Sequence, residues 1–114
     1  MDALEMTLLF DYYGDLLTER QRICFDLRHN QDLSLAEIAE ELQVSRQSIH
    51  DTLTRTEAQL RNMEEKTGCV ARDQKCRKVM DDISRLVSSL SEHPDPVVSA
   101  AAARIAGYAE QFEV

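Results

Sequence analysis

Tryptophan is absent from this sequence, glycine occurs three times, proline twice, and aromatic residues make up only 5% of 114 residues. Glycine and proline weaken helices more than any other residues, so their scarcity permits a chain that is helical almost throughout. No apolar run approaches the roughly 20 residues needed to cross a bilayer, and no secretory signal pattern opens the sequence. We therefore expect an all-α, cytoplasmic protein.

Patterns typical of enzymes and metal sites are also missing. The cysteines are odd in number, and Cys24, Cys69 and Cys76 lack the close spacing with histidine that a metal site needs. We expect these thiols to be reduced and structural. No glycine-rich phosphate loop or nucleophile motif occurs. The sequence thus predicts a protein that is not an enzyme and that uses no cofactor or metal.

Two amphipathic helices joined by a tight turn are predicted over residues 34–60. Ser34 and Glu37 have the S-x-x-E spacing of a capping box, which predicts a helix start near Leu35. Apolar residues then recur at the intervals of one helix face, which must meet a core. The members of this face are Leu35, Ile38, Ala39 and Leu42.

After a short break at Gln43 and Val44, Ser45 can cap a second helix. Its predicted inward face consists of Ile49, Leu53, Thr56, Leu60 and Met63. A short link between two amphipathic helices makes them pack at a steep angle, as in a helix-turn-helix motif. An ordinary corner of a helical bundle is the alternative.

Specific stretches of sequence extend this interpretation. The segments LTERQR (17–22), SLAEIAEEL (34–42) and VSRQSI (44–49) are similar to the fourth conserved region of bacterial sigma factors, a DNA-binding helix-turn-helix. A longer likeness joins FDYYGDLLTERQR (10–22) to SLAEIAEELQVSRQSIHDTLTRTEAQLRNMEEKTG (34–68). On these residues and its total length, the chain resembles the YlxM family of helix-turn-helix proteins.

This resemblance implies a regulatory role in the signal recognition particle pathway, because genes of the family tend to lie beside those for the particle's GTPase and its receptor. The implied partners are the protein of the particle, its RNA, or both. The sequence beyond Thr67 carries no recognised motif, so nothing is transferred to it.

Further helices are predicted before the motif. A helix over residues 3–13 is expected to cover the core with Leu4, Leu8, Leu9 and Tyr12. Thr18, with Gln21 three residues later, predicts the start of another helix that runs to about His29. Its expected inner face is Ile23, Cys24 and Leu27, whereas Phe25 is expected to pack against the N-terminal helix.

A helical extension is predicted after the motif. One helix is expected to start near Asp73 and another to span residues 97–112, joined by the connector HPDP at residues 93–96. The first carries an apolar seam of Cys76, Val79, Met80, Ile83, Leu86, Val87 and Leu90. The last helix or a second subunit can cover this seam. The predicted organisation is a helix-turn-helix domain over residues 1–66 and a C-terminal extension over residues 67–114, packed on it or paired with it.

Candidate nucleic-acid contacts lie at the start of the second motif helix, which enters the major groove in DNA-binding proteins. Arginine can bond guanine through two hydrogen bonds and glutamine can bond adenine, each pair discriminating by roughly 1–3 kcal/mol. The candidate residues are Arg46, Gln47, His50, Asp51 and Arg55. The alternative is that these side chains only solvate the surface.

The charge of the chain argues against tight binding of DNA by a monomer. Residues 18–62 contain six basic and eight acidic side chains, and the whole chain has a net charge of −8. Non-specific affinity for a duplex comes mainly from lysine and arginine, so either a clustered basic face or a dimer with two recognition helices is required.

A second candidate site could contact an RNA backbone, which is recognised largely through its shape, phosphates and 2′-hydroxyls. It is the basic cluster of Arg72, Lys75, Arg77 and Lys78. The alternative is a solvated helix surface with local ion pairs to neighbouring aspartates. Three functions remain open: an adaptor of the signal recognition particle, a sequence-specific DNA-binding transcriptional regulator, and a structural module that pairs through the seam.

Overall fold

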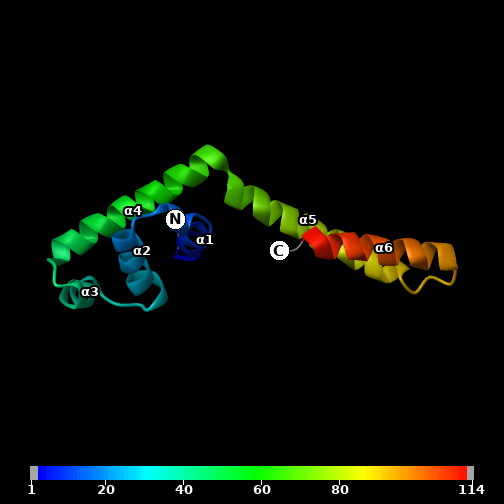
Figure 1. The fold of residues 1–114 in the computed structure, drawn as a ribbon, viewed down its shortest axis with the longest axis horizontal. Coiled ribbons are helices and arrows are strands. Elements are labelled where there is room, and N and C mark those ends of the chain that lie inside the picture. Colours follow the sequence, from blue (N-terminus) through cyan, green and yellow to red (C-terminus); the bar gives the residue numbers. More distant parts are fainter. Residues whose placement is uncertain (1–2, 113–114) are drawn as a thin grey trace. The chain divides into compact units, whose positions relative to one another are not determined.

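The computed structural model describes residues 3–112, over which every regular element is helical, so the predicted all-α class is confirmed (Figure 1). The elements are α1 (Ala3–Tyr13), a 3-10 turn (Gly14–Leu16), α2 (Glu19–Phe25), a π-helical segment (Asp26–Asn30), α3 (Leu35–Leu42), α4 (Arg46–Thr67), α5 (Cys69–Leu90) and α6 (Pro96–Phe112). None of these helices, within the described residues, is both long and apolar enough to span a membrane. The chain forms two compact units, Met1–Val70 and Ala71–Val114.

The long helix α4 is the element on which the first unit is assembled, because α1, α2 and α3 all pack against it (Figure 1). One buried cluster joins α1 and α2 to the second half of α4 and consists of Met6, Leu9, Tyr13, Leu17, Phe25, Leu60 and Val70. Another joins α2 and α3 to the first half of α4 and consists of Cys24, Leu27, Ile38, Ala39, Ile49 and Leu53. The adjacent residues Cys24 and Phe25 therefore serve two different clusters.

Helix α1 presents a different face from the one predicted. Leu9 is buried and Leu8 partly buried, but Leu4 and Tyr12 are 70% and 52% exposed. Tyr13 is buried instead because its hydroxyl finds partners on α4: it donates to Glu64 Oε1 at 2.7 Å and lies 2.5 Å from Thr67 Oγ1. Burial raises the pKa of the Tyr13 phenol.

Helix α2 starts as predicted, with Thr18 and Gln21 forming a complete capping box. Phe25 is fully buried and stacks on Phe10 of α1 at a centroid distance of 4.4 Å, which confirms the expected packing between these helices. Ile23 was expected inside but is 39% exposed. The buried face is defined by Gln21, Cys24 and Phe25, at positions i, i+3 and i+4, and Ile23 lies to one side of it.

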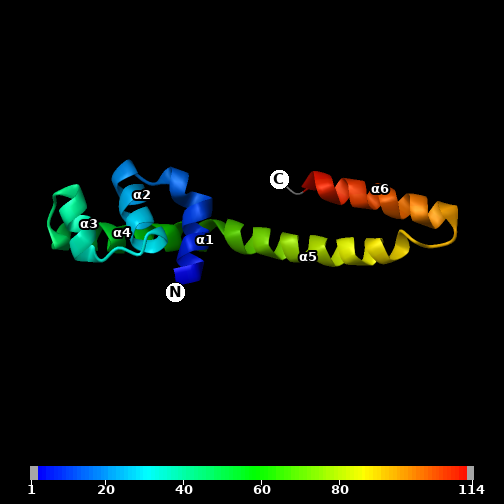
Figure 2. The ribbon, with the colours of Figure 1, turned by 90° about the horizontal axis from the view of Figure 1, so that it is seen from below.

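In the second unit, α6 folds back along α5 in the antiparallel direction (Figure 2). Helix α5 starts at Cys69, before the predicted position near Asp73, because Gly68 ends α4 in the left-handed region with φ 63° and a new helix follows at once. Among residues 71–112, the buried side chains are Val87 and Ala102. The rest of the predicted seam is partly or largely exposed.

Candidate nucleic-acid interface

The helix-turn-helix is fixed by hydrogen bonds that the local sequence specifies. The Ser34 hydroxyl accepts from Glu37 N at 3.1 Å, and the Glu37 carboxylate accepts from Ser34 N at 3.1 Å. Hydrogen bonds from the backbone amide and the hydroxyl of Ser34 to the carboxylate lower the pKa of Glu37. Gln43 then adopts a left-handed conformation with φ 57°, and the Ser45 hydroxyl accepts from Ser48 N at 3.0 Å to begin α4. The break between α3 and α4 is therefore a capped turn.

Packing under this turn decides which side chains of α4 face outward. Ile49 and Leu53 of α4 are buried with Ile38 of α3, in agreement with the inward faces predicted for the two helices. Leu42 lies at the edge of the same cluster and is partly buried. Since these apolar residues set the inward face of α4, the polar residues at its start are left on the surface. Each of the five candidates, Arg46, Gln47, His50, Asp51 and Arg55, is exposed.

Three of these candidates meet around a hollow between α3 and the start of α4. Arg46, Gln47 and His50 line it together with Leu35, and its volume is about 300 Å³. Leu35 contributes an apolar side chain to the lining, whereas the other three contribute hydrogen-bonding groups. The sequence placed Leu35 only in the core and did not predict this second role, since the hollow depends on the angle between two helices.

Gln47 also starts a series of candidates along α4 at intervals of four residues, which continues with Asp51 and Arg55. The Gln47 side-chain nitrogen donates to Asp51 Oδ1 at 2.9 Å, and Arg55 lies one turn further on. Asp51 therefore occupies the amide group that a base contact by Gln47 would use. Its negative charge also opposes the approach of a phosphate.

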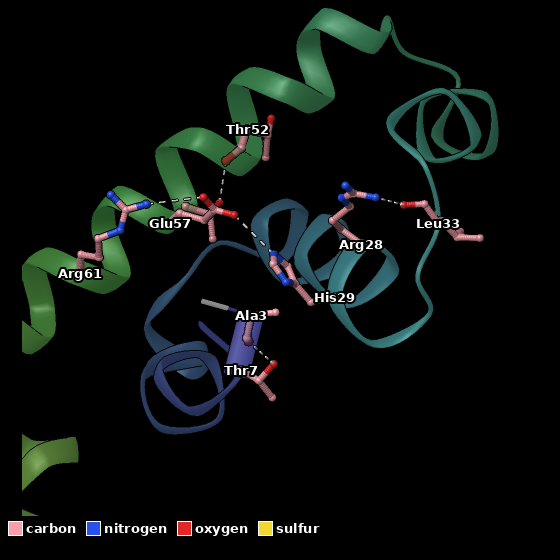
Figure 3. A network of polar contacts seen from close by, with 9 residues as sticks. Ala3, Thr7, Arg28, His29, Leu33, Thr52, Glu57 and Arg61 are labelled. Atoms are coloured by element: carbon pink, nitrogen blue, oxygen red, sulfur yellow. Dashed lines mark hydrogen bonds and ion pairs between the residues drawn. The ribbon is translucent and has the colours of Figure 1, made fainter. Parts of the chain in front are cut away.

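Several arginines of the first unit have partners within the unit and do not lie among the candidates. Arg28 donates to Leu33 O at 2.9 Å, and Arg61 lies 3.6 Å from Glu57 Oε2. Glu57 also faces His29, whose buried Nε2 lies 3.4 Å from Glu57 Oε1 (Figure 3). This contact between the π-helical segment and α4 could not be predicted from the sequence, because its members are far apart along the chain.

The basic cluster of the second unit is divided by the helical geometry of α5. Arg72, Lys75 and Lys78 recur every three residues and share one side of the helix, and all three are exposed. Arg77 lies on another side, where its Nε is 3.0 Å from Asp73 Oδ2. The structure thus presents a row of three basic residues and a separate ion pair in place of a single group of four.

Comparison with known families agrees with this geometry. The sequence profile of a family described as "UPF0122: Putative helix-turn-helix protein, YlxM / p13 like" matches residues 1–95. The chain belongs to this family. The match to UPF0122 covers the helix-turn-helix and α5, and ends directly before α6 begins at Pro96.

Individual UPF0122 proteins are similar to this chain over most of both lengths. One from Thermoanaerobacter sp. (strain X514) is 44% identical over 98 residues, which are 85% of this chain and 84% of that protein. One from Desulforamulus reducens is 44% identical over 92 residues, 81% and 79% of the two chains. One from Bacillus cereus (strain AH187) is 43% identical over 88 residues, 77% and 79%. Membership of a helix-turn-helix family supports a nucleic-acid-binding, regulatory role.

Proposed function

We propose that this protein is a non-enzymatic regulator that takes part in the signal recognition particle pathway by binding the RNA or the protein of the particle. The observation that carries the proposal is the exposed set Arg46, Gln47 and His50 around the hollow at the start of α4. The family resemblance supplies the pathway, and the exposed set supplies a surface for binding. The proposal implies a cytoplasmic protein.

The distribution of charge argues against long duplex DNA as the target. The net charge is −8, and the affinity of a protein for a duplex comes mainly from basic side chains that release counterions from the phosphates. Arg46 and Arg55 are exposed on the candidate surface, whereas Arg28 and Arg61 bond within the first unit. Few basic groups therefore remain for phosphates at this site.

Within this proposal, residues 1–66 are the binding domain and residues 67–114 are an extension. The row Arg72, Lys75 and Lys78 on α5 is proposed as a contact for RNA phosphates, with Arg77 beside Asp73 as a further contributor. Three phosphate contacts would give a modest but measurable dependence of RNA affinity on salt.

The proposal is tested by titrating the full-length protein against the RNA of the particle and, separately, against its GTPase. Fluorescence anisotropy at several salt concentrations is compared for wild type, Arg46→Ala with Gln47→Ala, and Lys75→Ala with Lys78→Ala. Arg104→Ala on α6 is the control, since it removes an exposed charge that belongs to neither set. We expect the first double variant to weaken binding about tenfold and the second to flatten the salt dependence. Absence of binding to both components would refute the proposal.

A second candidate function is a sequence-specific DNA-binding transcriptional regulator. It is favoured by the position of Arg46 and Gln47 in the first turn of α4, where recognition helices contact base edges. For this function, a single substitution at either residue should change the discrimination between the preferred base pair and the others by about 1–3 kcal/mol. A micromolar affinity that neither substitution changes would exclude base readout. A homodimer, which would present two recognition helices, is proposed for this function.

A further inference from the structure

An apolar stripe on α5 is left uncovered by α6. Its members, with exposed fractions in parentheses, are Val79 (47%), Ile83 (39%), Leu86 (67%) and Leu90 (44%). The side of α5 that α6 covers is a different one, marked by the buried Val87 and the partly buried Met80. At 3.6 residues per turn, the exposed stripe lies roughly a quarter turn away from this contact side.

Helix α6 has the same division into two sides. Its side toward α5 is formed by small residues, with Ala102 buried and Ala106 and Ala109 partly buried. Its uncovered apolar residues, with exposed fractions, are Val97 (76%), Ile105 (43%), Tyr108 (61%) and Phe112 (53%). This stripe also lies roughly a quarter turn from the contact side, in the same rotational sense as on α5.

Equal rotations about two antiparallel axes lead to the same side of a helical hairpin. The two stripes therefore form one surface, which we call the apolar face and which consists of the eight residues given with their exposed fractions above. Monomeric proteins rarely expose continuous apolar surfaces larger than a few hundred Å². The second unit, whose buried side chains among residues 71–112 are Val87 and Ala102, also has a very small core. The apolar face is thus a surface that requires a partner.

The spacing along α5 indicates what that partner is. The intervals between Val79, Ile83, Leu86 and Leu90 are four, three and four residues, so the stripe has the same spacing in both chain directions. A second copy of α5 in the antiparallel direction places Val79 against Leu90 and Ile83 against Leu86, and the two-fold axis repeats both pairs. This spacing makes a second copy of α5 a fitting partner, and the charges at the two ends of the helix then set the direction of pairing.

Charge selects the antiparallel direction. Arg72, Lys75 and Lys78 lie at the start of α5, whereas Glu92 and Asp95 follow its end. Antiparallel copies bring the basic start of one helix beside the acidic end of the other, and parallel copies bring like charges together. We propose that two copies of this chain associate through the apolar face, with antiparallel α5 helices, to form a four-helix bundle. This association does not depend on what the start of α4 binds.

The proposal is tested by sedimentation of the full-length protein over a wide concentration range. Wild type is expected to approach twice the chain mass of 13.0 kDa at high concentration. Ile83→Asp places a charge on the apolar face and should raise the dissociation constant at least about a hundredfold. Ser88→Asp adds the same charge on the opposite side of α5 and should leave it unchanged. Circular dichroism verifies that both variants stay helical.

A charge exchange tests the direction of pairing. Lys75→Glu combined with Lys78→Glu should weaken the dimer about threefold to tenfold, and adding Glu92→Lys should restore part of the loss. In a parallel dimer the first double variant would instead strengthen association, which would overturn the antiparallel arrangement. A wild-type monomer at all concentrations, or a dimer indifferent to Ile83→Asp, would overturn the proposed interface and leave the apolar face to a different protein.

Discussion

The Gln47 side-chain nitrogen lies 2.9 Å from the Asp51 carboxylate, one turn further along α4. Both residues are exposed on the candidate interface. A glutamine that reads adenine uses its nitrogen and its oxygen together, so Asp51 competes with the base for the nitrogen. The same carboxylate repels phosphate. Asp51 therefore competes with the nucleic acid that the interface is proposed to bind.

Replacing Asp51 with alanine should increase the affinity for nucleic acid about threefold to tenfold, because it releases Gln47 and removes the repulsive charge. Fluorescence anisotropy at several salt concentrations measures the change. Glu65→Ala, at the other end of α4, removes the same charge from the chain and should have little effect. An equal gain in both variants would mean that only total charge matters, and a loss with Asp51→Ala would mean that Asp51 contacts the ligand.

The left-handed conformation of Gln43 predicts an unusual order of stabilities at one position. Gln43 has φ 57°, which costs roughly 1–2 kcal/mol for residues with a Cβ and less for glycine. Gln43→Gly should therefore be about 1–2 kcal/mol more stable than Gln43→Val in denaturant titrations followed by circular dichroism. At Gln31, where φ is −101°, the same pair of variants should not favour glycine. The same order at both positions would show that strain at the turn is not the cause.

The capping box of α3 should give an acid-sensitive contribution to stability. Bonds from the backbone and hydroxyl of Ser34 lower the pKa of Glu37, so the stabilisation is complete above the ordinary value of 4.5 and is lost as the pH falls through the folded-state pKa. Ser34→Ala should cost about 1 kcal/mol at neutral pH. Glu37→Gln should reduce the acid dependence of the unfolding free energy, and Glu41→Gln on the same helix is the control. Identical acid slopes in both glutamine variants would contradict the assignment.

The three cysteines should differ sharply in their reaction with a maleimide. Cys24 is fully buried, and burial raises the pKa of its thiol, which keeps the reactive thiolate scarce. Cys69 and Cys76 are partly exposed. Mass spectrometry should find these two modified first in the native protein and Cys24 modified only after denaturant is added. Early labelling of Cys24 would show that α2 opens from α4 under native conditions.

Local signals were sufficient to predict the helix-turn-helix, because both capping boxes and the cap at Ser45 involve residues three positions apart. The inward face of α4 could also be predicted from the sequence, since mainly polar residues separate Ile49, Leu53 and Leu60 from one another. The orientation of α1 could not be predicted from the sequence, because apolar residues occur all around that helix. Its buried side is chosen by the contact of Tyr13 with Glu64, 51 residues away in sequence.

The candidate interface shows the same limit. The polar residues at the start of α4 follow from the apolar pattern, but the hollow beside Leu35 and the His29 contact with Glu57 require the packed helices. On α5, the sequence identified the apolar residues and not the side that α6 would cover. The small residues of α6 make that choice, because they allow close approach on the side of Val87 and leave Ile83 exposed.

The burial of Val70 has a practical consequence for any attempt to produce the first unit as a fragment. Val70 is the last residue of the buried cluster around Phe25 and Leu60, and its amide donates to Glu64 Oε1 at 2.9 Å. A fragment that ends at Gly68, where α4 ends, would lack the Val70 side chain and so leave a cavity in the buried cluster beside α1. It would also remove one hydrogen-bond donor to Glu64. Expression of such a shortened chain should give a less stable product than one cut several residues later, although both contain the entire helix-turn-helix.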